Sequence, residues 1–530
     1  MTTLEGTWPL VRLIVARDRL RLSAWIAGIV LLVLVTAIST IDIYPTQADL
    51  DAAAFAARDN PAALAFNGPD QGLDTIGGQV AFQVGAFGLV MVGLMSVLLI
   101  GRVTRGEEDS GRLELVRAMP VGRHAPLAAG LAVVAGAQVV LGALVALVLV
   151  QQDLPTMGSL VFGASFVAFG LTFIGITATT AQVTENPRVA SGIAGAVLGA
   201  SFAIRAVGDI GGGTLSWLSP MGWAQKARPY AGDVWWPLLL CVLLGAGLTW
   251  VAATLASHRD FGAGLVAPRP GPATAAPGLG SPMGLAIRLH RGAILWWTVS
   301  VLALGLTYGG LADSIDEFVG DNESIKDFLA ATGAASLTDS YLSTSLLIMA
   351  LLAAGPAIQI VLRLRGEETG LRAEPVLATS TSRWAWAGSH TTAALGGGAL
   401  ALVAGGLGLG LSYAVVGGDW DQVPRLLCAS LAYVPAVWLL AGLALALFGL
   451  LPRWTIGAWL ALVGCLVIGM FGTLLELPQW VMDLSPFQRT PAVPADPFDL
   501  LPVVALLTVA AALVGIGLVA FRSRDLVTSA

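Results

Sequence analysis

Charge is scarce in this sequence. Asp, Glu, Lys and Arg make up 12% of its 530 residues, whereas 56% of them are hydrophobic. Soluble domains typically carry about twice that charged fraction, so the composition excludes a soluble globular enzyme, a disordered chain and a nucleic-acid-binding domain. The apolar residues suffice for about a dozen membrane-spanning helices of some 20 residues each. The sequence therefore predicts an all-α polytopic membrane protein.

Lysine is almost missing, and this has a chemical consequence. A Walker A loop needs a lysine directly after glycine to reach the nucleotide phosphates, but neither Lys226 nor Lys326 follows a glycine. The sequence also lacks the H-E-x-x-H and G-x-S-x-G motifs of hydrolases. The three cysteines lie in apolar runs without disulfide or metal-ligand spacing, and the four histidines form no metal-binding cluster in the sequence. We expect a chain that is not catalytic by itself and binds no metal or cofactor.

Apolar runs of membrane-spanning length fall into two sets of six, one in each half of the chain. The first set lies near 23–42, 81–100, 126–150, 159–183, 189–209 and 235–257, and the second near 294–313, 344–362, 387–413, 425–450, 455–475 and 501–521. Between the sets, residues 263–282 are rich in Pro, Gly and Ala, as in a flexible linker. We therefore predict two six-span halves, residues 1–262 and 283–530, joined by this segment.

The basic residues indicate how the chain is oriented. Arg and Lys concentrate in the segments that face the cytoplasm when the N-terminus is placed inside, and most acidic residues fall on the other side. Cytoplasmic loops of membrane proteins carry this excess of positive charge. We expect a multi-pass protein of the plasma membrane with both termini in the cytoplasm. The acidic loops 43–80 and 314–343 would then form an extracellular cap.

The two halves are related by a duplication. The loop after the second span begins R-G-E-E at residues 105–108, and the loop after the eighth does so at residues 365–368. At this offset of 260, nine of nineteen positions are identical. Further pairs recur in the same order: Pro187-Arg188 with Pro452-Arg453, Leu218-Ser219-Pro220 with Leu484-Ser485-Pro486, and Arg259-Asp260 with Arg524-Asp525. Because six is even, we predict two parallel halves related by a pseudo-twofold axis along the membrane normal.

The two duplicated loops, residues 102–123 and 363–383, concentrate acidic and basic side chains and are called the charged loops below. A single loop of this kind would be read as a solvated surface. The identical placement of both glutamates in two copies favours a docking surface instead. Two equivalent cytoplasmic surfaces suit a symmetric dimeric partner.

This arrangement resembles a known family. The R-G-E-E loops, the cationic amphipathic segments 10–22 and 284–294, and the L-S-P element before the sixth span are similar to those of type-2 ATP-binding-cassette (ABC) exporter permeases. The fused twelve-span form resembles the actinobacterial exporters of polyketide antibiotics, of the tetronasin-resistance type. The resemblance implies a permease subunit in a bacterial plasma membrane that exports hydrophobic or amphipathic, drug-like compounds. It also implies that two copies of a separate ATPase subunit bind ATP and Mg.

The resemblance further assigns roles to residues. It implies that the charged loops are coupling helices seated in the ATPase subunits. The coupling residues would be Arg105, Glu107, Glu108, Arg112 and Glu114 in the first loop, and Arg365, Glu367, Glu368, Arg372 and Glu374 in the second. The second cytoplasmic loop of each half would contain Pro187, Arg188, Pro452 and Arg453. The second charged loop has Pro375 in place of Leu115, which predicts that its helix begins later or kinks.

A substrate path between the halves is also implied. Met91, Met95, Met349 and Trp459 are candidates to line an adaptable apolar cavity, with core packing or lipid contact as the alternative. Arg205 lies in the fifth span, where a charge has to be solvated or paired. It is a candidate to face the exit path, to pair with Asp209 or to extend to the outer interface.

Two other function classes compete with this interpretation. A proton-coupled multidrug antiporter of the major facilitator type also has twelve spans, and residues 109–112 resemble part of its cytoplasmic motif. Proton coupling needs a protonatable group near the middle of the membrane, but every carboxylate here falls in a loop or at a predicted helix end. The third class is a membrane scaffold or sensor without transport. We favour the ABC permease because it alone explains the duplicated glutamates.

Overall fold

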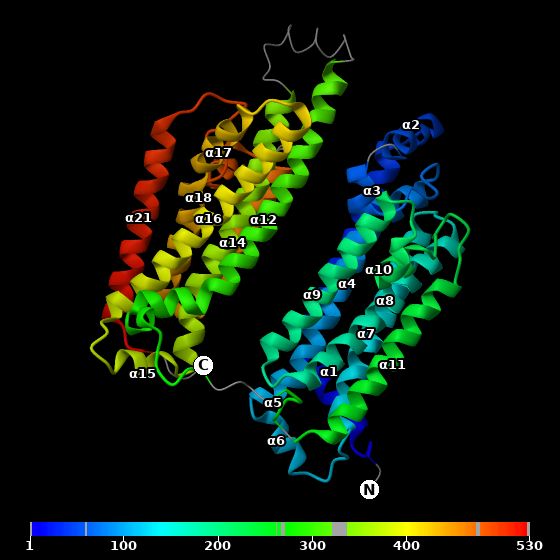
Figure 1. Cartoon of the computed structure of the whole chain (residues 1–530), viewed down its shortest axis with the longest axis horizontal. Helices are drawn as coiled ribbons and strands as arrows, with labels where there is room; N and C mark the ends of the chain where they lie inside the picture. The colour runs from blue at the N-terminus through cyan, green and yellow to red at the C-terminus, as the bar shows by residue number, and fades with distance from the viewer. Residues whose placement is uncertain are drawn as a thin grey trace. The chain divides into compact units, whose positions relative to one another are not determined.

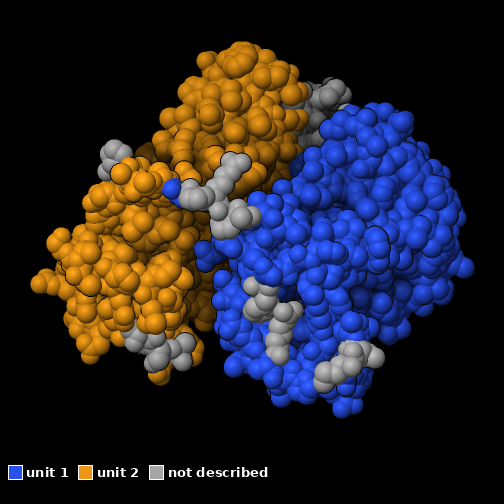
Figure 2. All heavy atoms as spheres, turned by 60° about the horizontal axis from the view of Figure 1, so that its bottom comes forward, with its two compact units in different colours: residues 1–271 blue, residues 272–530 orange. Residues whose placement is uncertain are grey.

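The computed structural model describes residues 3–58, 61–260, 262–266, 271–320, 337–472 and 477–526. Within these ranges the chain is helical and contains no strand, which confirms the predicted all-α class. The chain divides into two compact units, residues 1–271 and residues 272–530 (Figure 2). We call them unit 1 and unit 2.

The described residues of unit 1 form six long helices and several short ones (Figure 1). Its α-helices are α1 (Thr7–Ile43), α2 (Gln47–Arg58), α3 (Pro61–Asn67), α4 (Ile76–Gly101), α5 (Glu107–Asp109), α6 (Arg112–Arg117), α7 (Ala125–Gln151), α8 (Thr156–Val183), α9 (Pro187–Ile210), α10 (Pro220–Gln225) and α11 (Trp236–His258). A π-helix (η1, Arg102–Gly106) and a 3-10 helix (η2, Leu215–Leu218) complete it. Helices α2 and α3 lie at the opposite end of the unit from α5 and α6.

Unit 2 repeats this order with small differences. It contains η3 (Pro277–Gly280), α12 (Pro282–Gly320), α14 (Leu337–Thr369), α15 (Ala373–Leu377), α16 (Arg383–Gly417), α17 (Gln422–Ala432), α18 (Val434–Leu450), η4 (Pro452–Trp454), α19 (Gly457–Phe471), α20 (Gln479–Met482) and α21 (Leu500–Ser523). The amphipathic segments 10–22 and 284–294 are not separate helices. The first is part of α1 and the second is part of α12.

Eleven helical segments among the described residues are long and apolar enough to cross a membrane, with α17 and α18 counted together as Gln422–Leu450. The exception among the twelve predicted runs is 455–475, which forms α19. At 15 residues, α19 is about 22 Å long, shorter than a hydrocarbon core of about 30 Å. Pro452 begins a 3-10 turn, so the helix starts only at Gly457, and residues 473–476 lie outside the described part. Eleven of the twelve predicted runs thus form helices of the length and apolar character that a membrane span needs.

The helices of each unit pack in a matching pattern. In unit 1, α1 packs against α4 and α7, and α8 packs against α11. In unit 2, α12 packs against α14 and α16, and α18 packs against α21. Glycines allow the close approach at the α8–α11 and α18–α21 contacts. A Cβ added to Gly175 would lie 2.4 Å from the carbonyl oxygen of Gly245, and one added to Gly449 would lie 2.4 Å from that of Gly517.

The long acidic loop 43–80 of unit 1 is partly helical, as predicted. Pro61 is the first residue of α3, where its missing N–H has no helical partner to lose. The corresponding loop 314–343 of unit 2 lies largely outside the described residues. Whether either loop caps the extracellular side stays a prediction.

Candidate functional site

The two charged loops follow similar backbone paths, with one difference at the start. Helix α4 continues through the π-helix Arg102–Gly106 into α5, whereas α14 includes the equivalent residues in one continuous helix. Each loop then reaches a residue with left-handed backbone, Gly111 with φ 70° or Leu371 with φ 57°. The N–H of that residue donates to the carbonyl three residues earlier, at 3.1 Å in both loops. The short helices α6 and α15 follow, so the duplication in sequence is also a duplication in structure.

Glu108 joins the first charged loop to the last helix of unit 1. Its carboxylate accepts hydrogen bonds from Arg105 at 2.7 Å and from Arg259, the residue that directly follows α11, at 2.5 and 3.1 Å. The three side chains are at most 9% exposed. Arg105 also donates to the carbonyl oxygens of Ala181 and Ala263. A buried Arg–Glu–Arg triad therefore fixes this loop to the rest of its unit.

Glu368 does the same in unit 2. It accepts two hydrogen bonds from Arg524, at 2.7 and 2.8 Å, and a longer one from Arg365 at 3.5 Å. Arg524 directly follows α21, as Arg259 follows α11. Its guanidinium also lies 5.0 Å from the ring centre of Phe448 and 5.2 Å from that of Phe521. Both charged loops are thus attached to the C-terminal end of the last helix of their own unit.

The neighbouring glutamates have different partners. Glu107 lies 3.0 Å from a guanidinium nitrogen of Arg17, which belongs to α1. Glu367 accepts from Arg363 at 3.2 Å and from Arg372 at 2.8 Å, both within its own loop region. In unit 1 this glutamate contacts the first helix directly. In unit 2 it pairs with Arg363, which itself donates to the carbonyl oxygen of Leu289 in α12 at 3.0 Å.

The first helix of each unit also carries a buried polar residue that no local sequence pattern marks. Asp18 of α1 is 2% exposed and pairs with Arg17, Arg21 and Arg102 at 2.9 to 3.1 Å. In α12, the buried His290 lies 2.9 Å from a ring nitrogen of His390, on α16. The partners are 84 residues apart for Asp18 and Arg102 and 100 residues apart for the histidines.

Other predicted coupling residues point away from these attachments. The side chains of Arg112 and Glu114 on the first loop and of Arg372 and Glu374 on the second are exposed. They belong to α6, or to α15 and the residue before it. Arg372 pairs with Glu367, whereas Arg112, Glu114 and Glu374 make no ion pair among the described residues and are accessible to another molecule.

Pro375 has the predicted effect on the second loop. Helix α15 begins at Ala373, one position later than α6 at the offset of 260, so the proline is its third residue. The N–H of a third helical residue has no intrahelical acceptor, and a proline there costs little. The helix begins later and is not kinked.

The second cytoplasmic loops are only partly alike. Pro187 begins α9 directly, with the Asn186 side chain accepting from the N–H of Arg188 at 2.9 Å. Pro452 begins the 3-10 helix η4, and α19 starts five residues later. The side chains of Arg188 and Arg453 are both exposed.

The candidate path residues have different surroundings within their own units. Met95 and Met349 are fully buried, each within the core of its own unit, so core packing describes them better than a path. Trp459 is half-buried and packs against the core of unit 2. Met91 is half-buried and lines a surface groove of unit 1.

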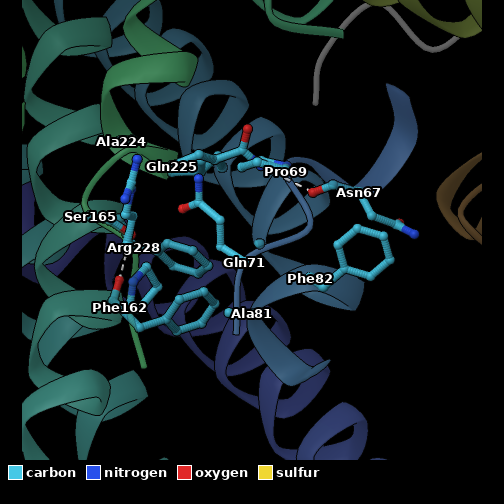
Figure 3. A pocket seen from close by; sticks show the side chains of 14 residues that line it. Asn67, Pro69, Gln71, Ala81, Phe82, Phe162, Ser165, Ala224, Gln225 and Arg228 are labelled. Carbon is cyan, nitrogen blue, oxygen red and sulfur yellow. Dashed lines mark hydrogen bonds between the residues drawn. The ribbon is translucent and has the colours of Figure 1, made fainter. Parts of the chain in front are cut away.

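Arg205 is fully buried near the end of unit 1 that carries α3. It contacts Asp209 at 3.5 Å and donates to the carbonyl oxygens of Leu64 and Phe66, both at 3.3 Å. The arginine therefore connects α9 to α3. A small cavity near that end, beside Gln71, Phe82 and Gln225 (Figure 3), measures about 40 Å³, which is room for about three water molecules.

Comparison with known proteins decides the family. A family model for the C-terminal domain of the multidrug efflux system permease Rv1217c matches residues 279–522. The chain is 40% identical over 523 residues to the multidrug efflux system permease protein Rv1217c of Mycobacterium tuberculosis, which covers 98% of this chain and 95% of that protein. The chain belongs to this family of efflux permeases. The predicted resemblance to a drug-exporter permease is confirmed, and the major facilitator antiporter is not favoured.

Membership of the efflux permease family also bears on the broader predictions. It indicates a multi-pass membrane transport protein rather than a catalytic enzyme. An efflux permease described as part of a system implies a further component.

Proposed function

We propose that the chain is the membrane-spanning subunit of an ATP-driven exporter, energised by separate ATPase subunits that dock on the two charged loops. The observation that carries this proposal is the pair of loops with similar backbone paths, each attached at its base and charged at its tip. ATP and Mg would be bound by the partner, since the sequence has no Walker A lysine. The relative's name supports drug-like, hydrophobic or amphipathic substrates.

A docking loop has two mechanical requirements, and different residues meet them. Its base has to move together with the membrane helices, and the buried pairs of Glu108 and Glu368 provide that attachment. Its tip has to be accessible, as Glu114 and Glu374 are. We therefore assign Arg105, Glu108, Arg365 and Glu368 to positioning the loops, and Glu114 and Glu374 to contact with the ATPase.

We also propose the twelve-span topology with both termini in the cytoplasm, in which α19 and its flanking residues form the eleventh span. The asymmetric distribution of arginine supports this orientation. Two docking loops per chain imply one permease with two ATPase subunits. A purified complex that contains two permeases would contradict this stoichiometry.

The test is charge reversal at the loop tips in the complex with the ATPase. Glu114→Arg and Glu374→Arg should each weaken association by about tenfold or more, because close charge pairs at interfaces contribute upwards of about 1.5 kcal/mol. Drug-stimulated ATPase activity should fall in parallel. Asp42→Arg, a reversal at the exposed far end of α1, is the matched control. If both loop variants fold and still assemble and respond like the wild type, the charged loops are not the docking site.

A further inference from the structure

A groove lies on the surface of unit 1 between α1 and α4. It measures about 550 Å³. Its walls are mainly apolar, and its one charged residue is an arginine. The residues that define it are Arg21, Trp25, Ile29 and Leu32 of α1 with Phe87 and Met91 of α4. Phe87 is 54% exposed, so the groove opens on the outside of the helix bundle.

The arginine end of the groove continues into a basic hollow. This second depression, also about 550 Å³, shares Arg21 and is lined further by Arg17, Arg102 and Arg112. The carboxylates that contact these arginines are Asp18, paired with three of them, and Glu107, paired with Arg17. Four guanidinium groups thus face two carboxylates, which leaves an excess of positive charge. Arg112 makes no ion pair among the described residues.

The dimensions of the combined surface match one leaflet of a bilayer. Arg21 and Leu32 are eleven residues apart on a continuous helix, which corresponds to about 16 Å at 1.5 Å per residue. Half of a hydrocarbon core is about 15 Å. Trp25 lies one turn beyond Arg21, and tryptophan side chains gather at the level of the lipid headgroups. The basic hollow would therefore lie at headgroup depth, with the groove beside the acyl chains.

We propose that this surface binds an anionic phospholipid from the leaflet on the side of the charged loops. Its phosphate lies among Arg21, Arg102 and Arg112, and one acyl chain follows the groove past Met91. Guanidinium groups pair well with phosphate oxygens, and basic pockets between membrane helices select anionic headgroups. Because Arg112 belongs to α6, the lipid contacts the first charged loop directly.

The second charged loop does not offer the same residues. At the offset of 260, Leu362 stands in place of Arg102. Arg372, the counterpart of Arg112, is already paired with Glu367 at 2.8 Å. The lipid site therefore belongs to unit 1. It requires that the chain spans a membrane but does not require that an ATPase docks on it.

The test is lipid binding to the purified full chain without any ATPase. Native mass spectrometry with added phosphatidylglycerol or phosphatidylcholine should show about tenfold preference for the anionic lipid. The double variant Arg21→Gln/Arg112→Gln should bind phosphatidylglycerol about tenfold more weakly and lose the preference. Arg19→Gln, an exposed arginine of the same helix outside both hollows, is the matched control and should stay within about twofold.

A second variant tests the groove without changing charge. Gly28 lines the groove, and a Cβ there meets no atom within 4 Å, so Gly28→Leu should fill the groove while favouring the helix. We expect about tenfold weaker phosphatidylglycerol binding. Gly136→Leu on α7, at another open position, is the control. Unchanged binding in the arginine and groove variants would overturn the proposal. So would displacement of the lipid, one for one, by an exported drug, which would make the groove a drug site.

Discussion

The two charged loops follow similar backbone paths but differ in how they contact the first helix of their unit. In both, a buried glutamate pairs with the arginine that follows the last helix of the unit. In unit 1, Glu107 and Arg102 form ion pairs with α1. In unit 2, Glu367 pairs within its own loop region, and Arg363 contacts α12 only at the carbonyl oxygen of Leu289. The two copies thus have the buried glutamate–arginine pair in common and differ in their half-exposed ion pairs. Buried charges tolerate the loss of a partner least, which accounts for the difference.

The largest change in unfolding free energy is expected at the buried glutamates, which both loops have. Glu108→Gln and Glu368→Gln each leave two arginines without a carboxylate, and breaking such a buried pair costs about 3–5 kcal/mol. Glu368 is 1% exposed against 9% for Glu108, so its replacement should be the more costly of the two. Chemical unfolding of the purified chain measures both, with the exposed Glu114→Gln as control. Losses below about 0.5 kcal/mol, as for ordinary surface changes, would show that the triads do not stabilise the loops.

The next prediction contrasts the first helices of the two units. Asp18→Asn removes one carboxylate from three arginines that are partly exposed, which should cost about 3 kcal/mol of unfolding free energy. His290→Leu breaks a hydrogen bond between neutral rings and should cost about 1–2 kcal/mol. The same unfolding experiment compares them. An equal or smaller loss for Asp18→Asn would mean that the arginines around it are adequately solvated without it.

Exchanging Leu115 and Pro375 between the short helices should have a smaller effect on stability, and only in the first loop. Leu115 is the fourth residue of α6, beyond the positions where a helix tolerates proline best, whereas Pro375 is the third residue of α15. Leu115→Pro should destabilise α6 by about 1–3 kcal/mol, and Pro375→Leu should leave the stability of α15 nearly unchanged. Hydrogen–deuterium exchange of residues 112–118 and 372–378 reports each helix separately. Equal loss of protection in both variants would contradict the assigned starting points of the helices.

The smallest expected effect concerns the left-handed position. Gly111→Leu should destabilise the first loop by about 1 kcal/mol, and this is a purely conformational cost because a Cβ there meets nothing within 4 Å. Leu371→Gly should stabilise the second loop by only about 0.5 kcal/mol, since glycine also gains freedom in the unfolded chain. Thermal unfolding of the two single variants and the double variant measures this. If Gly111→Leu and Leu371→Gly both stabilise or both destabilise the chain, the two loops differ in backbone conformation at this position.

Hydropathy was sufficient to predict most of the fold. Eleven of the predicted apolar runs lie in helices of spanning length because about 20 apolar residues have few alternatives to a membrane helix. Within the run 455–475, the described helix starts only at Gly457, and composition does not show that the chain forms a turn after Pro452 before the helix starts.

The charged loops were located from the repeat, but their internal contacts were not. The Arg-Asp repeat at 259–260 and 524–525 was visible, yet nothing in its spacing connects it to glutamates more than 150 residues away. Hydropathy also cannot distinguish a methionine in a core from one in a groove, which is why Met95 and Met91 received the same interpretation. The pair of His290 and His390 and the groove beside Gly28 arise from packing between helices, and no local pattern marks them.

The attachment of each loop to the end of its unit has a consequence for biosynthesis. Glu108 is made 151 residues before Arg259, and at about 5–20 residues per second the ribosome needs about 8–30 s to cover that distance. During this interval the first loop has been synthesised but lacks its final partner. The last residue needed to complete the loop thus follows the last membrane helix of the unit. Translation order therefore makes the finished loop a sign that every helix of unit 1 has already been synthesised.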